Sequence, residues 1–135
     1  MAALRRCICW LPANGFPIGV YNPIMKQMEE TLNSFHQHET PASREYKVVG
    51  SDVYQYLSER YITWEEVTRK VIPAVEAQAA ADGPVIGIGH SFGGALLTCA
   101  AALRPELFSS IVMIDSPMVF SGVKCFAFNL VPHFI

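Results

Sequence analysis

The sequence has few charged residues and no excess of either sign. Charged side chains make up 16% of the 135 residues, and ten basic against twelve acidic residues give a net charge of −2. A protein that binds nucleic acid through its phosphates needs a strongly basic surface, so we expect no nucleic-acid partner. The content of hydrophobic residues, 51%, excludes an intrinsically disordered chain. The length is typical of one domain.

Long apolar runs are also missing. No stretch reaches the roughly 18 apolar residues of a membrane-spanning helix, so we expect no membrane span. The apolar run Cys7–Leu11 is ended by Pro12, and a secretory signal needs roughly 7–15 apolar residues. These absences lead us to expect a cytoplasmic protein.

Paired cysteines in a metal-binding spacing are absent as well. A zinc ribbon needs two C-x-x-C pairs, whereas the closest cysteines here, Cys7 and Cys9, are separated by one residue inside an apolar run. In a strand they would point to the same face, which suits two small core side chains. We therefore expect structural thiols at Cys7, Cys9, Cys99 and Cys125, no metal site and no other cofactor.

Apolar, strand-like segments alternate with segments of helical periodicity. This alternation is typical of an α/β fold, in which helices flank a parallel sheet. The strands are expected at residues 6–11, 46–51, 85–88 and 110–114.

Three helices are expected between these strands. The first should start with Asn22 as its cap and place Met25, Met28, Leu32 and Phe35 on one face, with a loop over residues 36–44. Thr63 and Glu66 form a capping-box pattern that opens the second helix, and the third should span residues 93–103. Residues 54–61 are compatible with either a loop or a short helix.

The turn between the third strand and the third helix carries a serine flanked by glycines. Gly89, His90, Ser91, Phe92 and Gly93 match the G-x-S-x-G nucleophile elbow. The chemistry needs this pattern because the serine must stand on a strained turn, and side chains two residues before and after it would collide. The following helix would direct its free N–H groups at a developing oxyanion.

A second interpretation of the same glycines is a dinucleotide-binding fingerprint, G-x-G-x-x-G. Gly87 and Gly89 would begin it, and Asp115 ends the next strand, where a ribose-binding acid would stand. The third glycine position, however, holds Phe92, whose ring would block close packing of helix and strand. We favour the elbow and keep a dinucleotide-binding domain as the less favoured alternative.

With the elbow in place, the sequence resembles the α/β-hydrolase superfamily, and its esterase-like members in particular. The first strand leads into Ala13–Pro17, which resembles the oxyanion turn of that superfamily, with Asn14 where many members have histidine. The segments 48–52 and 111–117 resemble its next strand and the strand after the elbow helix. The resemblance extends over most of residues 4–118.

The resemblance implies a serine hydrolase that acts on an ester-like acyl substrate. Ser91 would be the nucleophile, the main-chain N–H groups of Phe16 and Phe92 would form the oxyanion hole, and Gly89, His90 and Gly93 would shape the elbow. Asp115 is a candidate for the catalytic acid, and its alternative is a turn acid before Ser116.

The superfamily places its catalytic histidine late in the chain, after the serine and the acid. Of the four histidines, His36 and His38 precede the serine, His90 adjoins it, and His133 lies where a lid would begin. We therefore expect residues 1–117 to form the N-terminal half of the fold, with about four of the usual eight strands. Residues 118–135 would begin a lid or cap segment that is truncated.

Such a fragment would lack the histidine base and would be inactive alone. The alternative from another class is a non-catalytic half-fold or a gene-model fragment. The choice among esterase, lipase, thioesterase and acyltransferase stays open, as does the oligomeric state.

Overall fold

The described part of the chain is built around a four-stranded sheet. The computed structural model describes residues 4–39, 44–52 and 63–117. The strands are β1 (Leu4–Leu11), β2 (Arg44–Gly50), β3 (Val85–His90) and β4 (Phe108–Ile114). They run in the order β2-β1-β3-β4, and all three pairs are parallel. The expected α/β fold with a parallel sheet is confirmed, and the strand before Ser91 is an inner one.

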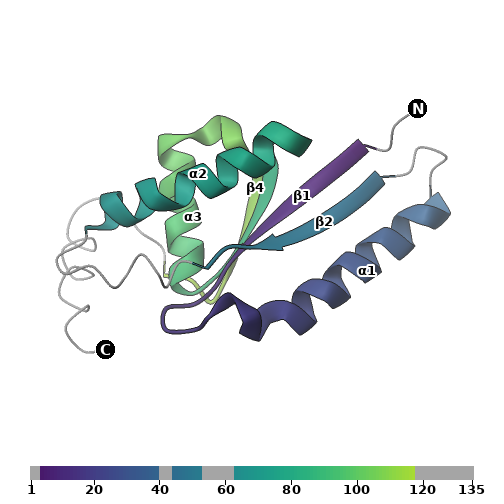
Figure 1. Ribbon diagram of the computed structural model, residues 1–135, viewed down its shortest axis with the longest axis horizontal. Coiled ribbons are helices and arrows are strands. Elements are labelled where there is room, and N and C mark those ends of the chain that lie inside the picture. Colours follow the sequence, from purple (N-terminus) through teal and green to yellow (C-terminus); the bar gives the residue numbers. More distant parts are fainter. Residues whose placement is uncertain (1–3, 40–43, 53–62, 118–135) are drawn as a thin grey trace.

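Helices cover both faces of this sheet. Helix α1 (Asn22–Glu39), preceded by the 3-10 turn η1 (Ile18–Tyr21), lies along one face, and α2 (Trp64–Asp82) and α3 (Phe92–Leu103) lie on the other (Figure 1). A short 3-10 turn, η3 (Pro105–Leu107), leads from α3 into β4. Strands β1, β2 and β3 are thus each followed by a helix that returns the chain to the starting edge of the sheet.

Strand β1 is buried on both faces because it lies between two strands and two helical layers. Its odd-numbered residues Cys7, Cys9 and Leu11 face the core shared with α2 and α3. Ile8 and Trp10 face the core shared with α1. The alternation follows from the two-residue period of a strand, and it explains why the segment reads as a continuous apolar run.

The thiols of β1 are core side chains. Cys7 and Cys9 are buried and free. The hydrogen bond with Cys7, together with burial, raises the pKa of the Cys9 thiol, so that Cys9 stays protonated at neutral pH. Within residues 4–39, 44–52 and 63–117 no cluster of three histidine, cysteine or acidic side chains could hold a metal ion.

The start of α2 follows from its sequence. The Thr63 hydroxyl accepts a hydrogen bond from the Glu66 N–H at 3.2 Å, and the Glu66 carboxylate accepts one from the Thr63 N–H at 2.6 Å. The predicted capping box is confirmed. Inside the helix, Val67, Val71 and Val75 are buried, as their spacing indicates.

The expectations for α1 were partly wrong. Asn22 has helical angles (φ −51°, ψ −43°) because it continues the turn η1, so it is not an extended cap. The helix runs to Glu39 over part of the expected loop. Phe35 is 64% exposed, although Met25 is buried. At 100° per residue Phe35 lies about 80° around the helix from Met25, which places it at the edge of the apolar stripe.

Two further expectations fall wholly outside the described residues. The uncertain segment 54–61 belongs to the undescribed range 53–62, and the expected lid segment 118–135 is undescribed throughout. Strands β3 and β4 are longer than expected, since pairing with their neighbours extends them to His90 and back to Phe108.

Strand β4 forms an edge of the sheet in the described part of the chain. Val112, Met113 and Ile114 are 46%, 40% and 40% exposed, respectively.

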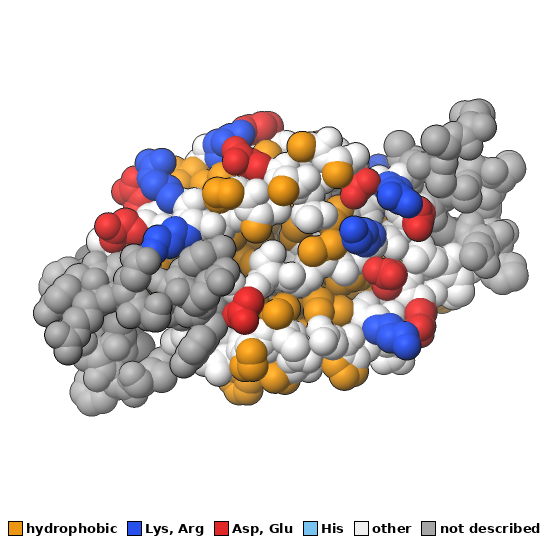
Figure 2. All heavy atoms as spheres, viewed as in Figure 1, with side chains coloured by type: hydrophobic (Ala, Val, Ile, Leu, Met, Phe, Trp, Pro, Cys, Tyr) orange, Lys and Arg blue, Asp and Glu red, His pale blue; other side chains and the backbone are white. Residues whose placement is uncertain are grey.

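The face shown in Figure 2 carries interspersed acidic and basic side chains rather than a patch of one sign. No helix among the described residues is long and apolar enough to cross a membrane.

Candidate active site

The candidate site lies where the carboxyl ends of three strands meet. Leu11 of β1 is paired with Gly89 of β3, and His90 of β3 is paired with Ile114 of β4. One edge of the sheet therefore holds Ser91, Asp115 and the turn that follows β1. Such an edge is where open α/β sheets bind ligands.

Ser91 occupies a strained backbone position directly between β3 and α3. Its angles are φ 50° and ψ −115°, and it is one of two non-glycine residues with positive φ in the described part. The positive φ agrees with the expectation for a strand–turn–helix serine. A conformation of this kind costs about 1–3 kcal/mol and persists only where the surroundings enforce it.

The surroundings hold Ser91 through its main chain. The Ser91 N–H donates a 2.8 Å hydrogen bond to the Ile114 carbonyl at the end of β4. The Ser91 carbonyl accepts hydrogen bonds from the N–H groups of Gly94 (3.1 Å) and Ala95 (3.3 Å) in α3. The turn is therefore tied both to the neighbouring strand and to the following helix.

Three glycines leave the space that this turn needs. A Cβ on Gly89 would lie 2.3 Å from the Gly94 nitrogen, and one on Gly93 would lie 2.4 Å from the Leu11 carbonyl oxygen. A Cβ on Gly94 would lie 2.0 Å from the Ser116 Oγ. Gly89 is pressed against the start of α3 as expected, whereas Gly93 is needed mainly because α3 touches the end of β1.

Phe92 is the first residue of α3. Its ring packs on Trp64 at the start of α2, with ring centroids 4.8 Å apart. The first N–H groups of a helix have no acceptor within it, and they carry the positive end of the helix dipole. The Phe92 N–H, next to Ser91, is therefore suited to bind an anion.

In the turn after β1, the N–H group of Phe16 is hydrogen-bonded within the turn itself. The Phe16 N–H donates to the Ala13 carbonyl at 3.2 Å, and Gly15 has a φ of 79°. These features describe a β-turn. An oxyanion bound by Phe16 would have to share or replace this long hydrogen bond, so the donor role of Phe16 stays a prediction.

His90 faces the start of α1. Its Nδ1 lies 2.8 Å from the Tyr21 hydroxyl oxygen. His36 and His38 belong to the last turns of α1, which end next to the start of β2 at the opposite edge of the sheet (Figure 1). His133 lies outside the described residues. Within the described part, the structure thus places no histidine as a base for Ser91.

Asp115 directly follows β4, is exposed and has a φ of 48°. Within the described residues its carboxylate makes no hydrogen bond to Ser91 or His90, so its role as the acid stays a prediction. The next residue, Ser116, donates from Oγ to the Gly89 carbonyl at 3.3 Å. This link between β4 and the elbow was not anticipated from the sequence.

The glycines do not form a dinucleotide fingerprint. Gly87 and Gly89 both lie inside β3, whereas the fingerprint places its glycines in the turn after the strand. A Cβ on Gly87 would lie 3.2 Å from Leu97 Cδ1. These glycines instead allow α3 to pack closely on β3.

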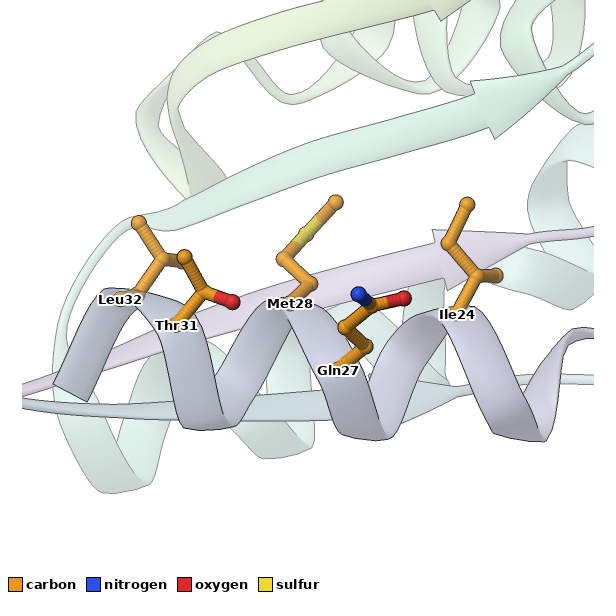
Figure 3. A pocket seen from close by; sticks show the side chains of 5 residues that line it. All are labelled: Ile24, Gln27, Met28, Thr31 and Leu32. Atoms are coloured by element: carbon orange, nitrogen blue, oxygen red, sulfur yellow. The ribbon is translucent and has the colours of Figure 1, made fainter. Parts of the chain in front are cut away.

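A shallow groove elsewhere on the molecule is separate from this site. It is lined entirely by α1, by the side chains Ile24, Gln27, Met28, Thr31 and Leu32, which project from one side of the helix (Figure 3). None of them belongs to the turns at the carboxyl edge of the sheet.

Comparison with known proteins identifies the fold family. A family model described as the alpha/beta hydrolase fold matches residues 33–134, which include Ser91 but not the 13–17 turn. The type I acyl-CoA thioesterase mpaH of Penicillium roqueforti (strain FM164) is 26% identical over 107 residues, covering 75% of this chain and 24% of the thioesterase. The lipase LipV of Mycobacterium tuberculosis is 44% identical over 43 residues, covering 32% of this chain and 16% of the lipase.

Solved structures of low sequence identity share the fold. A mutant of polyneuridine aldehyde esterase has a TM-score of 0.67 at 16% identity, covering 93% of this chain and 46% of the esterase. The peroxisomal alpha-beta-hydrolase Lpx1 of Saccharomyces cerevisiae has a TM-score of 0.63 at 18% identity, covering 90% of this chain and 36% of Lpx1. The chain thus spans less than half the length of these relatives.

The family match extends over well more than half of the chain, and the parallel sheet and its helices agree with it. This chain belongs to the alpha/beta hydrolase fold family.

Proposed function

We propose that this chain carries the nucleophile of a serine hydrolase that cleaves ester-like acyl substrates. The observation that carries the proposal is the geometry of Ser91, a non-glycine residue with positive φ between an inner strand and a helix N-terminus, in a member of the alpha/beta hydrolase fold family. The similar proteins named as a thioesterase and a lipase support a carbonyl substrate with an oxygen or sulfur leaving group.

In the proposed reaction, the Ser91 hydroxyl oxygen attacks the acyl carbon while its proton passes to a base. The bond between the acyl carbon and the leaving group then breaks, and the leaving group takes up the proton. Water hydrolyses the resulting acyl-enzyme and regenerates the serine. The negative charge on the carbonyl oxygen would be held by the N–H of Phe92, which has no acceptor within the helix.

Phe16 is the proposed second donor of this oxyanion hole. The turn that contains it starts beside the elbow, because Leu11 and Pro12 contact the position of Gly93. Its N–H would exchange the 3.2 Å bond to Ala13 for the substrate oxygen.

The proposal requires a base and an acid that complete the triad. A histidine base would come from polypeptide outside the described residues, with residues 1–117 supplying the nucleophile part of the fold. Asp115 is the candidate acid in the described part, since it ends the strand next to β3.

A non-catalytic half-fold is the competing function. It is favoured by the absence of a suitably placed histidine among the described residues and by the exposed apolar side chains of β4. On this view the chain would act by docking on a partner rather than by cleaving a substrate.

Fluorophosphonate labelling separates the two functions. We expect the 135-residue chain to label poorly, because a serine hydroxyl without a base is a weak nucleophile. A form extended at its C-terminus by polypeptide with a later histidine should label, and Ser91→Ala should abolish the label. Ser110→Ala, which changes an exposed serine of β4, should not.

One result would overturn the proposal, and a second would change only the source of its base. An extended, folded form that does not label would support the non-catalytic function. Fast labelling of the 135-residue chain at Ser91 would show that the base lies within it, and His133 would be the first residue to replace.

A further inference from the structure

Tyr21 links the turn after β1, eight residues before it, to a segment that is 69 residues away. It is the last residue of η1, and its hydroxyl oxygen lies 2.8 Å from His90 Nδ1 and 3.0 Å from the Ala13 nitrogen. Ala13 opens the turn that follows β1, and His90 precedes Ser91. One hydroxyl group therefore connects the turn after β1 with the elbow.

The hydrogen bonds of this group are mutually consistent. The Ala13 N–H can only donate, so the Tyr21 oxygen accepts from it. The same oxygen forms a hydrogen bond with His90 Nδ1 in either tautomer of the imidazole, since the Tyr21 O–H can donate to Nδ1 and the oxygen can accept from an Nδ1–H. Without the hydroxyl, the Ala13 N–H and His90 Nδ1 would both lose a partner in a partly buried place.

The ring of Tyr21 is held from two sides. Its centroid lies 5.7 Å from that of Trp10 and 5.9 Å from that of His90, in tilted and edge-on arrangements. Trp10 is a buried residue of β1. The core beneath the ring thus limits where the hydroxyl can lie.

Ala13 transmits this restraint to Phe16. Its N–H is bound by Tyr21, and its carbonyl accepts the Phe16 N–H. The peptide groups on both sides of Ala13 are therefore anchored, and the direction of the Phe16 N–H depends on them.

We propose that Tyr21 is a positioning residue that clamps the Ala13–Pro17 turn to the elbow. The clamp keeps the N–H groups of Phe16 and Phe92 at a constant separation beside Ser91. Tyr21 acts through Ala13 and His90 and does not touch the substrate. The role of the clamp in catalysis rests on the proposed hydrolase function, whereas its effect on the turn does not.

Hydrogen exchange and NMR on the 135-residue chain test the clamp without any activity. Tyr21→Phe should speed exchange of the Ala13 and Phe16 amides by about tenfold, because the Ala13 N–H loses its acceptor. It should also shift the ¹⁵N resonances of His90, since Nδ1 loses its hydrogen-bond partner. Tyr46→Phe is the matched control, because Tyr46 belongs to the same core cluster but lies on β2. Unchanged exchange and unchanged His90 resonances in Tyr21→Phe would overturn the clamp.

A double-mutant comparison distinguishes the loss of this hydrogen bond from a general loss of stability. Tyr21→Phe and His90→Asn break the same hydrogen bond, so their effects on the urea midpoint should not add in the double variant. Additive effects would show that the two side chains act independently and would contradict the clamp.

Kinetics of the extended, labelling form test the catalytic consequence. Tyr21→Phe should lower kcat by about tenfold with little change in KM, because the oxyanion is bound only in the transition state. Tyr46→Phe should leave both constants unchanged. Faster amide exchange in Tyr21→Phe with an unchanged kcat would refute the positioning role. A fluorophosphonate label that survives Ser91→Ala would refute the proposed hydrolase and would leave the exchange result unaffected.

Discussion

Replacing Gly93 by alanine tests the close approach between α3 and the end of β1. The added Cβ would lie 2.4 Å from the Leu11 carbonyl oxygen and 2.6 Å from the Pro12 carbonyl oxygen. Both contacts are with main-chain atoms, which cannot rotate away as a side chain would. The turn after β1 or the start of α3 must therefore move.

The cost can be worked out from this geometry. Overpacking of this kind costs about 1–3 kcal/mol, and alanine recovers at most about 1 kcal/mol of helix propensity near the start of α3. Because both contacts are under 3 Å and with main-chain atoms, we take the upper end of this cost, about 3 kcal/mol, and expect a net loss of about 2 kcal/mol in the free energy of unfolding. With a urea m-value of about 2 kcal/mol/M, the unfolding midpoint should fall by about 1 M.

Urea unfolding followed by tryptophan fluorescence measures this loss, since Trp10 is buried in β1 and Trp64 packs on Phe92. Gly19→Ala is the matched control, because the nearest atom to its Cβ would be Asn22 Nδ2 at 3.9 Å. Gly19→Ala should shift the midpoint little or raise it slightly. Equal midpoints for the two variants would refute the close approach, and with it the geometry inferred for the elbow.

Three further predictions concern other parts of the chain. The Thr63 N–H lowers the pKa of the Glu66 carboxyl, so the stability due to this group is present above the unfolded pKa of about 4.3 and is lost as the pH falls through the folded value. Glu66→Gln should remove that part of the pH dependence of the urea midpoint, and an identical pH profile would contradict it. The Cys9 thiol should resist alkylation at pH 8 in the folded chain and react in urea, as followed by peptide mass spectrometry; rapid alkylation of the folded chain would show that Cys9 is accessible. In the extended form, Asp115→Asn should lower kcat by about 10⁴ if Asp115 is the acid, and an unchanged kcat would assign Asp115 to the turn alone.

The sheet and the strand–turn–helix geometry at Ser91 were predictable because they depend on local chemistry. Apolar runs such as Cys7–Leu11, the glycines around Ser91 and the capping pattern of Thr63 each constrain a short segment. The predicted bounds of the strands were less accurate, since pairing between strands decides where β3 ends and where β4 begins. Phe35 is exposed because its spacing from Met25 places it at the edge of the apolar stripe.

The contacts that complete the candidate site were not predictable from local patterns. Tyr21 lies in a turn-rich stretch between two prolines, and its partner His90 is 69 residues away. Ser116 reaches the Gly89 carbonyl across 27 residues. The internal hydrogen bond of Phe16 depends on the conformation of the whole turn. A motif search alone could not find these contacts, because no motif brings the partners together.

Trapping the acyl-enzyme tests the central claim most directly. The extended form is mixed with an activated ester, quenched in acid within a single turnover, and the acylated peptide is sequenced by mass spectrometry. Our account predicts one acyl group, bonded to the Ser91 oxygen and absent in Ser91→Ala. An acyl group on another residue, or turnover of the ester with no covalent intermediate and no dependence on Ser91, would contradict it.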